Sequence, residues 1–317
     1  MKQTEKILVI GACGQIGREL TAALRKQIPR HCVIAADIQP EDKIGLEVYP
    51  YRQLNVLDKE KLEALIAEEK ITQIYHLAAM LSANGELNPQ AAWRLNMDSL
   101  LSVLDLSVKY QVKKVFWPSS IAVFGPDSQK QNCPQQGITE PVTIYGISKA
   151  AGEYWCKYYF EKFGLDVRSL RYPGLISYSA LPGGGTTDYA VDIFHHAVKG
   201  EPFTCFLEED TALPMMYMHD AIRATLELMD APADQLLVRT SYNLGALSFT
   251  PKEIYEEIEK EVPGFMIRYA PDFRQQIAES WPQSVDDSQA KKDWGWDPAY
   301  DLKSMVSEML SKLSVLS

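Results

Sequence analysis

The chain has 317 residues, of which 46% are hydrophobic, so it is long enough for one large α/β domain or two smaller ones. Its formal net charge of −10 argues against a nucleic-acid surface or an anionic membrane surface, because both would need clusters of basic residues. No apolar run approaches the length of a membrane span, about 20 residues. We therefore expect no nucleic-acid partner and no membrane partner.

The five cysteines are scattered and contain no Cys-x-x-Cys pair, so neither a disulfide framework nor a structural zinc site is indicated. The five histidines lack the spacing of zinc enzymes, and we expect no metal site. The first predicted strand begins close to the N-terminus and leaves no room for a signal or transit peptide, although a processed chain would look the same. We expect a cytoplasmic protein with reduced thiols.

The first half of the sequence alternates strand and helix patterns. An apolar run from Lys6 to Ile10 predicts the first strand, and an amphipathic pattern from Gln15 to Gln27 predicts the first helix. Further strands are predicted at Cys32–Ala36, Tyr51–Val56, Ile71–Ala79, Lys113–Ser120 and Asp166–Tyr172, and further helices at Lys59–Glu69, Pro89–Tyr110 and Thr143–Phe163. This alternation predicts an α/β fold with a Rossmann-type doubly wound parallel sheet.

The pattern changes after Gly174. Residues 177–218 are expected to be rich in loops, whereas a helix near His219–Met229 and a strand at Tyr242–Leu244 return to the sheet. From Thr250 onwards, helices alternate with brief extended segments. The expected division is an NAD-binding domain of residues 1–176 and about 219–245, with a smaller discontinuous C-terminal substrate lobe of residues 177–218 and 246–317.

Three glycines at intervals of three, Gly11, Gly14 and Gly17, fall on the turn between the first strand and the first helix. Glycine has no Cβ, so backbone can approach a pyrophosphate there, and the helix N-terminus supplies N–H donors and partial positive charge. The second strand leads to Asp37, twenty residues after Gly17, where a carboxylate can accept hydrogen bonds from the adenosine ribose. A glycine triplet alone is often only a turn, but this combination predicts a dinucleotide site.

Tyr145 and Lys149 lie four residues apart in a predicted helix and therefore share a face. A free tyrosine has a pKa near 10 and is a poor base at neutral pH. A nearby ammonium and the positive nicotinamide ring of an oxidised cofactor both favour the phenolate. A Tyr–Lys pair at this spacing is common on helices. Here it follows a dinucleotide turn and a strand that delivers Ser119 and Ser120, so it predicts a proton-transfer site.

Several motifs occur together in the first half: Gly11-x-x-Gly14-x-x-Gly17, Asp37, His76-Leu77-Ala78-Ala79, Asn96, Ser119-Ser120-x-x-x-x-Gly125, Tyr145-x-x-x-Lys149 and Arg171-Tyr172-Pro173-Gly174. With them, the chain resembles the extended short-chain dehydrogenase/reductases over essentially its whole length. In that superfamily the active-site hydroxyl lies 25 residues before the tyrosine, which implies Ser120 rather than Ser119. The resemblance implies that Ser120 binds the reacting oxygen, Tyr145 is the general base, and Lys149 holds the nicotinamide ribose and tunes Tyr145.

Three stretches of the second half are more specific: Gly183-Gly184-Gly185-Thr186-Thr187-Asp188-Tyr189-Ala190, Leu213-Pro214-Met215-Met216-Tyr217-Met218-His219-Asp220-Ala221 and Ser280-Trp281-Pro282. They resemble the short-chain type of L-threonine 3-dehydrogenase. This likeness implies oxidation of the L-threonine 3-hydroxyl to L-2-amino-3-oxobutanoate, with hydride transfer to NAD and without zinc. It also implies a homodimer, as is usual in the superfamily.

The expected site has a cofactor part and a substrate part. The residues expected to bind NAD are Gly11, Gly14, Gln15, Ile16, Gly17, Asp37, Ile38, Asn55, Val56, Leu77, Ala78, Ala79, Asn96, Tyr145, Lys149, Tyr172, Pro173, Gly174 and Leu175. Those expected to contact L-threonine are Ser82, Ser120, Tyr145, Gly185, Thr186, Thr187, Asp188 and Trp281. A glycine-rich turn can aim N–H groups at the substrate carboxylate, and Asp188 can accept from its ammonium. Whether Thr186 or Thr187 touches the substrate, and whether Trp281 covers the site or only packs, stays open.

Two alternatives belong to other functional classes. A sugar-nucleotide epimerase or dehydratase of the same superfamily usually presents arginines to a nucleotide diphosphate, and here no arginine lies between Tyr172 and Arg223. A non-catalytic NAD-binding sensor would need no proton-transfer group, so the intact Ser120, Tyr145 and Lys149 argue against it.

Overall fold

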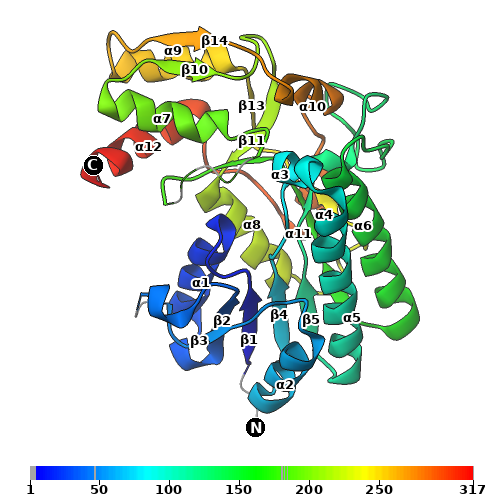
Figure 1. Cartoon of the computed structure of the whole chain (residues 1–317). Helices are drawn as coiled ribbons and strands as arrows, with labels where there is room; N and C mark the ends of the chain where they lie inside the picture. The colour runs from blue at the N-terminus through cyan, green and yellow to red at the C-terminus, as the bar shows by residue number, and fades with distance from the viewer. Residues whose placement is uncertain (1–4, 46–47, 180, 182, 184, 317) are drawn as a thin grey trace.

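The computed structural model of the protein describes residues 5–45, 48–179, 181, 183 and 185–316, and its centre is a six-stranded parallel sheet (Figure 1). The strand order is β3 (Tyr51–Gln53), β2 (Val33–Asp37), β1 (Ile7–Ile10), β4 (Gln73–His76), β5 (Lys114–Phe116) and β7 (Asp166–Arg168). The order reverses between β1 and β4, which confirms the predicted doubly wound, Rossmann-type sheet. In such sheets, ligands bind in the crevice outside the carboxyl ends of the strands at this reversal.

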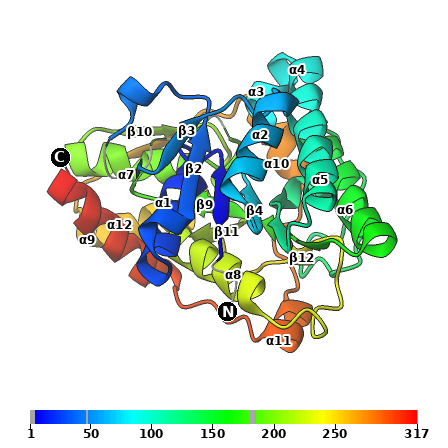
Figure 2. The same ribbon diagram turned by 90° about the horizontal axis from the view of Figure 1, so that it is seen from below.

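Helices cover both faces of the sheet (Figure 2). Helices α1 (Gln15–Gln27) and α8 (Met218–Asp230) lie on one face, and α2 (Lys59–Glu69), α5 (Ser99–Lys109) and α6 (Ile144–Phe163) lie on the other. Successive strand side chains point to opposite faces, so alternate residues of β1 enter the two different cores. This explains why the β1 sequence is apolar throughout.

Two predicted strands are interrupted. The segment Lys113–Ser120 forms β5 and then β6 (Ser119–Ser120), and the segment Asp166–Tyr172 forms β7 and then β8 (Leu170–Tyr172). Pro118 has no N–H for the ladder, which favours the break before β6. Strands β6 and β8 join β12 (Tyr242–Asn243) in a separate three-stranded sheet, so Ser120 lies outside the central sheet.

The predicted helix Pro89–Tyr110 is a continuous helical segment in three parts: α4 (Pro89–Trp93), a π-helical turn at Arg94–Asp98, and α5. Such turns are frequent at functional sites, and this one contains Asn96. A short helix, α3 (Ser82–Leu87), also forms between the predicted strand Ile71–Ala79 and the predicted helix Pro89–Tyr110.

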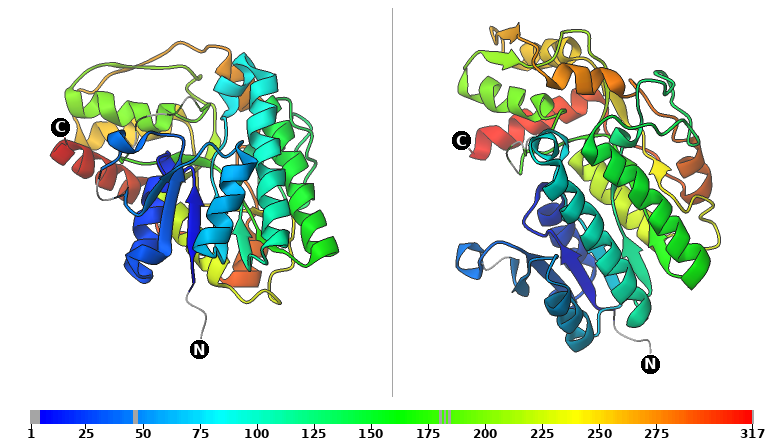
Figure 3. Two further views of the ribbon diagram at one scale, coloured as in Figure 1. Left: turned by 60° about the horizontal axis from the view of Figure 1, so that its bottom comes forward. Right: turned by 45° about the vertical axis from the view of Figure 1, so that its right-hand side comes forward.

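A second lobe lies above the carboxyl edge of the sheet and contains α7 (Tyr189–Lys199), α9 (Pro251–Glu261) and α12 (Leu302–Leu316) (Figure 3). Its remaining elements are β10 (Phe203–Cys205), which pairs with β14 (Ile267–Tyr269), and helix α10 (Arg274–Ser280); α11 (Ser288–Trp294) lies beside the sheet domain. Strand β11 (Leu213–Tyr217) pairs with β9 (Gly174–Ile176) and with β13 (Leu247–Phe249), which connects the two lobes.

The segment 177–218, which was expected to be rich in loops, has irregular stretches but also contains α7, β10 and β11. Their buried apolar residues, such as Tyr189, Phe194 and Phe203, form one core with Met305 and Met309 of α12. Local periodicity does not reveal this burial, since the partner residues lie about a hundred positions further along the chain. In the described part of the chain, no helix has the length and apolar character needed to cross a membrane.

Candidate active site

One cavity of about 250 Å³ opens at the carboxyl ends of β1 and β4 and brings most of the predicted residues together. Its lining includes Gly11, Gly14, Gln15, Ile16, Gly17, Leu77, Ala79, Ser82, Ser120, Tyr145, Lys149, Tyr172, Pro173, Gly174, Leu175, Gly185, Thr186, Thr187, Asp188 and Trp281. These residues come from both lobes, so the cavity lies between the sheet and the C-terminal lobe. Pro182 and Gly184 of the glycine-rich stretch lie outside the described residues.

The glycine turn between β1 and α1 leaves room for a ligand at one specific position. A Cβ placed on Gly17 would lie 2.2 Å from Gly11 O, and one on Gly11 would lie 2.8 Å from Ala78 N, so the turn itself requires these two glycines. A Cβ on Gly14 meets only Gly11 O, at 3.4 Å. Gly14 is also the N-cap of α1, which has no side-chain cap and no acidic residue in its first turn. The turn therefore fits the pyrophosphate of a dinucleotide.

Asp37 lies at the end of β2 beside this turn, although it does not line the cavity. Its carboxylate accepts from Cys13 N at 2.9 Å and from Gln39 N at 3.2 Å. Tyr51 donates to Asp37 O at 3.1 Å, so both the backbone and the side chain are fixed. A carboxylate held at this place suits the ribose hydroxyls of NAD.

Five other residues predicted to bind NAD also lie outside the cavity lining: Ile38, Asn55, Val56, Ala78 and Asn96. Ile38 is 62% exposed, and Val56 is buried. Asn55 Oδ1 accepts from Leu57 N at 3.1 Å. Ala78 packs against Gly11 of the dinucleotide turn.

Asn96 fixes the segment that follows β4. Its Oδ1 accepts from Met80 N at 2.8 Å, and its Nδ2 donates to Met80 O at 3.1 Å and to Ser148 Oγ at 3.1 Å. It therefore ties the segment after β4 to helix α6.

Tyr145 and Lys149 lie in the first turns of α6, which is capped by Thr143, whose hydroxyl accepts from Gly146 N at 3.1 Å. A Cβ on Gly146 would lie 2.1 Å from Ala122 O, so this glycine allows α6 to approach the segment after β6. Ser120 Oγ accepts from Ala122 N at 3.2 Å in the same segment. This close packing brings the three candidate catalytic residues to one cavity.

Burial disfavours the charged forms of Tyr145 and Lys149. It raises the pKa of Tyr145 to about 12, although a hydrogen bond with Ser120 acts in the opposite direction. It lowers the pKa of Lys149 to about 7. Lys149 Nζ donates to Pro118 O at 2.5 Å and lies 4.3 Å from the centre of the Trp117 ring. Burial therefore dominates the tyrosine pKa in the protein alone, whereas the lowered pKa expected from the sequence needs the positive nicotinamide ring as well as the ammonium.

The substrate-side segment is held by its own hydrogen bonds. Gly185 N donates to Asp188 Oδ2 at 2.7 Å, so this N–H is already used within the turn. Thr186 is 1% exposed, and its hydroxyl lies 3.3 Å from Ser82 Oγ. Thr187 is half-buried and so close to Gly174 that a Cβ there would lie 2.7 Å from Thr187 Cβ. Trp281 both lines the cavity and packs in the core of the C-terminal lobe.

Four lining residues were missed as site residues in the sequence: Leu81, Pro118, Ser119 and Ile121. Pro118 was detectable, because a proline directly before Ser119-Ser120 indicates the break that turns these serines out of the central sheet. Leu81 and Ile121 carry no chemical signal, since an apolar residue beside a motif is usually a core residue.

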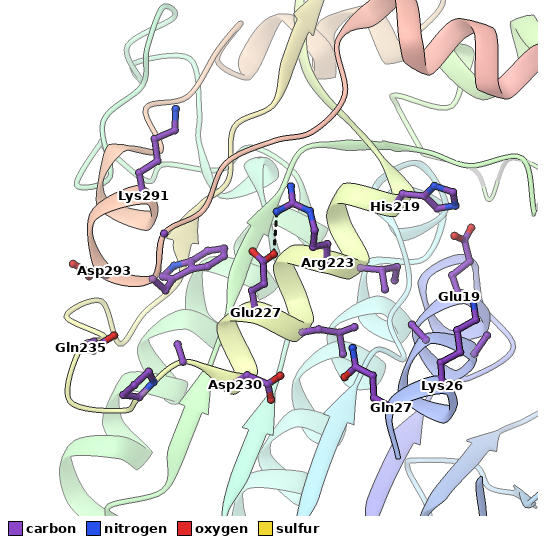
Figure 4. Close-up of a pocket in the computed structure, with 18 of the residues that line it drawn as sticks. Glu19, Lys26, Gln27, His219, Arg223, Glu227, Asp230, Gln235, Lys291 and Asp293 are labelled. Atoms are coloured by element: carbon purple, nitrogen blue, oxygen red, sulfur yellow. Dashed lines mark hydrogen bonds and ion pairs between the residues drawn. The ribbon is translucent and has the colours of Figure 1, made fainter. Parts of the chain in front are cut away.

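A second hollow of about 960 Å³ lies between α1, α8 and α11, and none of the predicted site residues lines it (Figure 4). It carries basic and acidic side chains together, and Arg223 pairs there with Glu227 at 3.0 Å. The candidate chemistry is therefore confined to the smaller cavity.

The NAD dependent epimerase/dehydratase family matches residues 7–245, which is most of the chain. The chain belongs to this family. Bovine mitochondrial L-threonine 3-dehydrogenase is 45% identical over 97% of this chain and 82% of its own length. A solved partial consensus L-threonine 3-dehydrogenase is 57% identical, with a TM-score of 0.96 over 98% of this chain and 99% of its own. The holo form of the GalE-like L-threonine dehydrogenase from Cupriavidus necator is 56% identical, with a TM-score of 0.95 over 97% and 99%. NAD is the cofactor of the family, and it fits the turn described above.

Proposed function

We propose that this protein oxidises the 3-hydroxyl of L-threonine to L-2-amino-3-oxobutanoate. The observation that carries the proposal is the convergence of Ser120, Tyr145 and Lys149 with the glycine turn and the 185–188 segment on one cavity. The similarity to several L-threonine dehydrogenases over nearly the whole chain supports this substrate over a sugar nucleotide.

Tyr145 is the proposed general base, and it accepts the proton of the substrate hydroxyl at its phenolic oxygen. Ser120, which already bonds Tyr145, donates to the reacting oxygen and holds it beside the base. Lys149 binds the nicotinamide ribose and contributes positive charge. When bound, NAD supplies the hydride acceptor and a further positive charge, and both cations favour the phenolate.

The proposed NAD contacts run from the adenosine end of the cofactor to its nicotinamide end. Asp37 binds the adenosine ribose, and the turn of Gly11, Gly14 and Gly17 binds the pyrophosphate at the N-terminus of α1. The segment Tyr172–Leu175, which lines the same cavity, is proposed to complete the nicotinamide end. Asn96 supports this end through Met80 and Ser148.

The substrate is a small zwitterion, and the far wall of the cavity is polar. The paired hydroxyls of Ser82 and Thr186, the side chain of Thr187 and the carboxylate of Asp188 can bind its charged groups. Trp281 covers this end and excludes water.

The test is NADH formation, followed by absorbance, when L-threonine and NAD are added to the purified protein. UDP-sugars serve as the control substrates. In the presence of NAD, we expect steady NADH production with L-threonine and none with the UDP-sugars. Conversion of a UDP-sugar without net NADH, and no reaction with threonine, would identify an epimerase instead.

A further inference from the structure

A buried ion pair adjoins the candidate catalytic residues without lining their cavity. Arg171 donates through Nε to Glu153 Oε1 at 2.8 Å and through Nη2 to Glu153 Oε2 at 2.7 Å. Glu153 is 3% exposed and Arg171 is 5% exposed. Such two-point arginine–carboxylate pairs are strong and directional.

The Glu153 carboxylate joins three segments of the site. Glu153 follows Lys149 by one helical turn of α6, and it accepts from Ser119 Oγ of β6 at 2.6 Å. Arg171 belongs to β8, where Ser119 pairs with Arg171 and Ser120 with Tyr172. One carboxylate therefore connects the helix of Tyr145 and Lys149 with the strand of Ser120 and the strand that leads to the 172–175 segment.

The Nη1 group of Arg171, which does not bond Glu153, has hydrogen-bond partners as well. Arg171 Nη1 donates to Gln135 O at 2.9 Å and to Asn243 Oδ1 at 3.0 Å. Its guanidinium lies 5.1 Å from the centre of the Phe124 ring. Each guanidinium nitrogen of Arg171 therefore has a hydrogen-bond partner, and a buried network of this kind rigidifies the segments that it joins.

We propose that Glu153 is a positioning residue that, through Ser119 and Arg171, holds Ser120 in register with Tyr145 and Lys149. This inference rests on the roles given to those three residues in the proposed function. Glu153 itself touches neither substrate nor cofactor.

The charges near Lys149 give Glu153 a second, electrostatic effect at the site. Burial lowers the pKa of Lys149, while Cys156 and Glu153 of the same helix oppose that shift. Burial raises the pKa of the Cys156 thiol well above its usual range, so the thiol is neutral. Tyr145 is neutral at pKa about 12, and His76 of β4 is neutral because burial lowers its pKa to about 3. Glu153 is therefore the anion that stabilises the ammonium, and Arg171 on β8 shares that charge.

The direct test is Glu153→Gln, with NAD affinity measured by calorimetry across pH and kcat measured with L-threonine. In the wild type, NAD affinity should fall as the pH rises through about 7, where Lys149 loses its proton. In the variant the fall should occur at a pH lower by roughly half a unit or more. We expect kcat to fall by at least about tenfold, because misplacement of catalytic groups by about 1 Å costs up to a hundredfold.

Two controls separate positioning from stability. Asp166→Asn disrupts another largely buried pair, in which Asp166 binds Arg168 at 2.7 Å and Arg239 at 2.9 Å. Like Glu153→Gln, it should lower the unfolding temperature, but it should leave the pH dependence of NAD affinity unchanged. Ser119→Ala removes the hydrogen bond and retains the charge, so it should lower kcat without moving that pH.

A Glu153→Gln protein with wild-type kcat and wild-type pH dependence would overturn the inference, even if Tyr145→Phe is inactive. A fully active Tyr145→Phe would instead overturn the proposed function. Should Glu153→Gln fail to fold, Glu153→Asp and Ser119→Ala decide the question. Unchanged kcat in both overturns the inference, and lowered kcat in both, with an unmoved pH dependence, supports it.

Discussion

Tyr145 and Lys149 occupy positions that oppose their charged forms. Burial raises the pKa of the phenol to about 12 and lowers that of the ammonium to about 7. Two titratable groups perturbed in opposite directions in one cavity are typical of a catalytic site. The site therefore needs further positive charge to form the phenolate. In the proposed reaction, bound NAD supplies that charge.

Replacing Tyr145 by Phe should remove most of kcat and leave NAD affinity near the wild-type value, because only the proton acceptor is lost. General acid–base groups contribute about a hundredfold to ten-thousandfold. In the wild type, kcat should rise with pH up to the pKa that Tyr145 has in the NAD-bound complex, because the phenolate fraction rises over that range. Steady-state kinetics across pH check this. A variant that keeps more than about a tenth of kcat would show that Tyr145 is not the base.

The two threonines of the substrate segment differ in the structure. Thr186 is almost fully buried and already shares a hydrogen bond with Ser82, whereas Thr187 is half-buried at the cavity wall. We expect Thr187→Ala to lower kcat/KM for L-threonine at least about tenfold, equivalent to about 1.4 kcal/mol, without changing NAD affinity. Exposed Thr204 in β10, changed to Ala, is the matched control. If Thr187→Ala and Thr186→Ala both match the wild type, Ser82 and Trp281 become the candidates for substrate binding.

At the scale of elements, two glycines of the turn between β1 and α1 have separable roles. Gly17 is needed for folding, and Gly14 is expected to be needed for NAD binding. Gly17→Ala should destabilise the protein, because the added Cβ would lie 2.2 Å from Gly11 O. Gly14→Ala meets only one atom, at 3.4 Å, so the protein should fold with a nearly unchanged unfolding temperature. Its methyl group would occupy the phosphate cradle, and NAD affinity should fall at least about tenfold, or about 1.4 kcal/mol. Calorimetric titration and thermal unfolding measure the two effects. Wild-type NAD affinity in Gly14→Ala would place the pyrophosphate elsewhere.

The elements that sequence analysis found correctly are those with a strong local pattern, such as β1, α1 and α6. The π-helical turn was not predictable, because residues 94–98 keep a helical pattern whether the turn is α or π. The two strands within the segment 177–218 were not predicted for a different reason. Strands β10 and β11 are short, and they are stabilised by pairing with β14, β9 and β13, none of which adjoins them in sequence.

At the scale of the whole molecule, sequence motifs identified most residues of the site. The hydrogen bonds that these residues make depend on tertiary packing and were not predictable from the motifs. Gly11, Tyr145 and Thr186 reach one cavity from three distant regions, as the motifs implied. Spacing alone did not show that Asp188 bonds the Gly185 N–H or that Asn96 braces Met80. Those bonds depend on the conformation of irregular segments, which has no periodic signal in the sequence.

An exposed aromatic face on α6 bears on the assembly of the molecule. Tyr158 lies with its ring centre 5.8 Å from that of Trp155 and 6.1 Å from that of Phe163, and these side chains are 43%, 38% and 53% exposed. Tyr154 beside them is 63% exposed. Contiguous apolar surface of this kind marks an interaction site, and a two-fold dimer is the commonest assembly that covers one patch with its own copy. We therefore propose a homodimer that pairs this face with itself.

Light scattering should give the mass of a dimer for the wild type and the mass of a monomer for the double variant Trp155→Glu and Tyr158→Glu. A dimer of the variant would bury four carboxylates that face one another across the two-fold axis, which is unfavourable. Met266→Glu, at a 60% exposed residue of the C-terminal lobe, should stay dimeric. The monomer should also unfold at a lower temperature that no longer depends on protein concentration, since association stabilises only the folded state. A wild type that remains monomeric at high concentration, or a dimeric double variant, would remove α6 as the interface. Because Tyr145 and Lys149 lie in the first turns of α6, a dimer through this face would also restrain the helix that carries the proposed base.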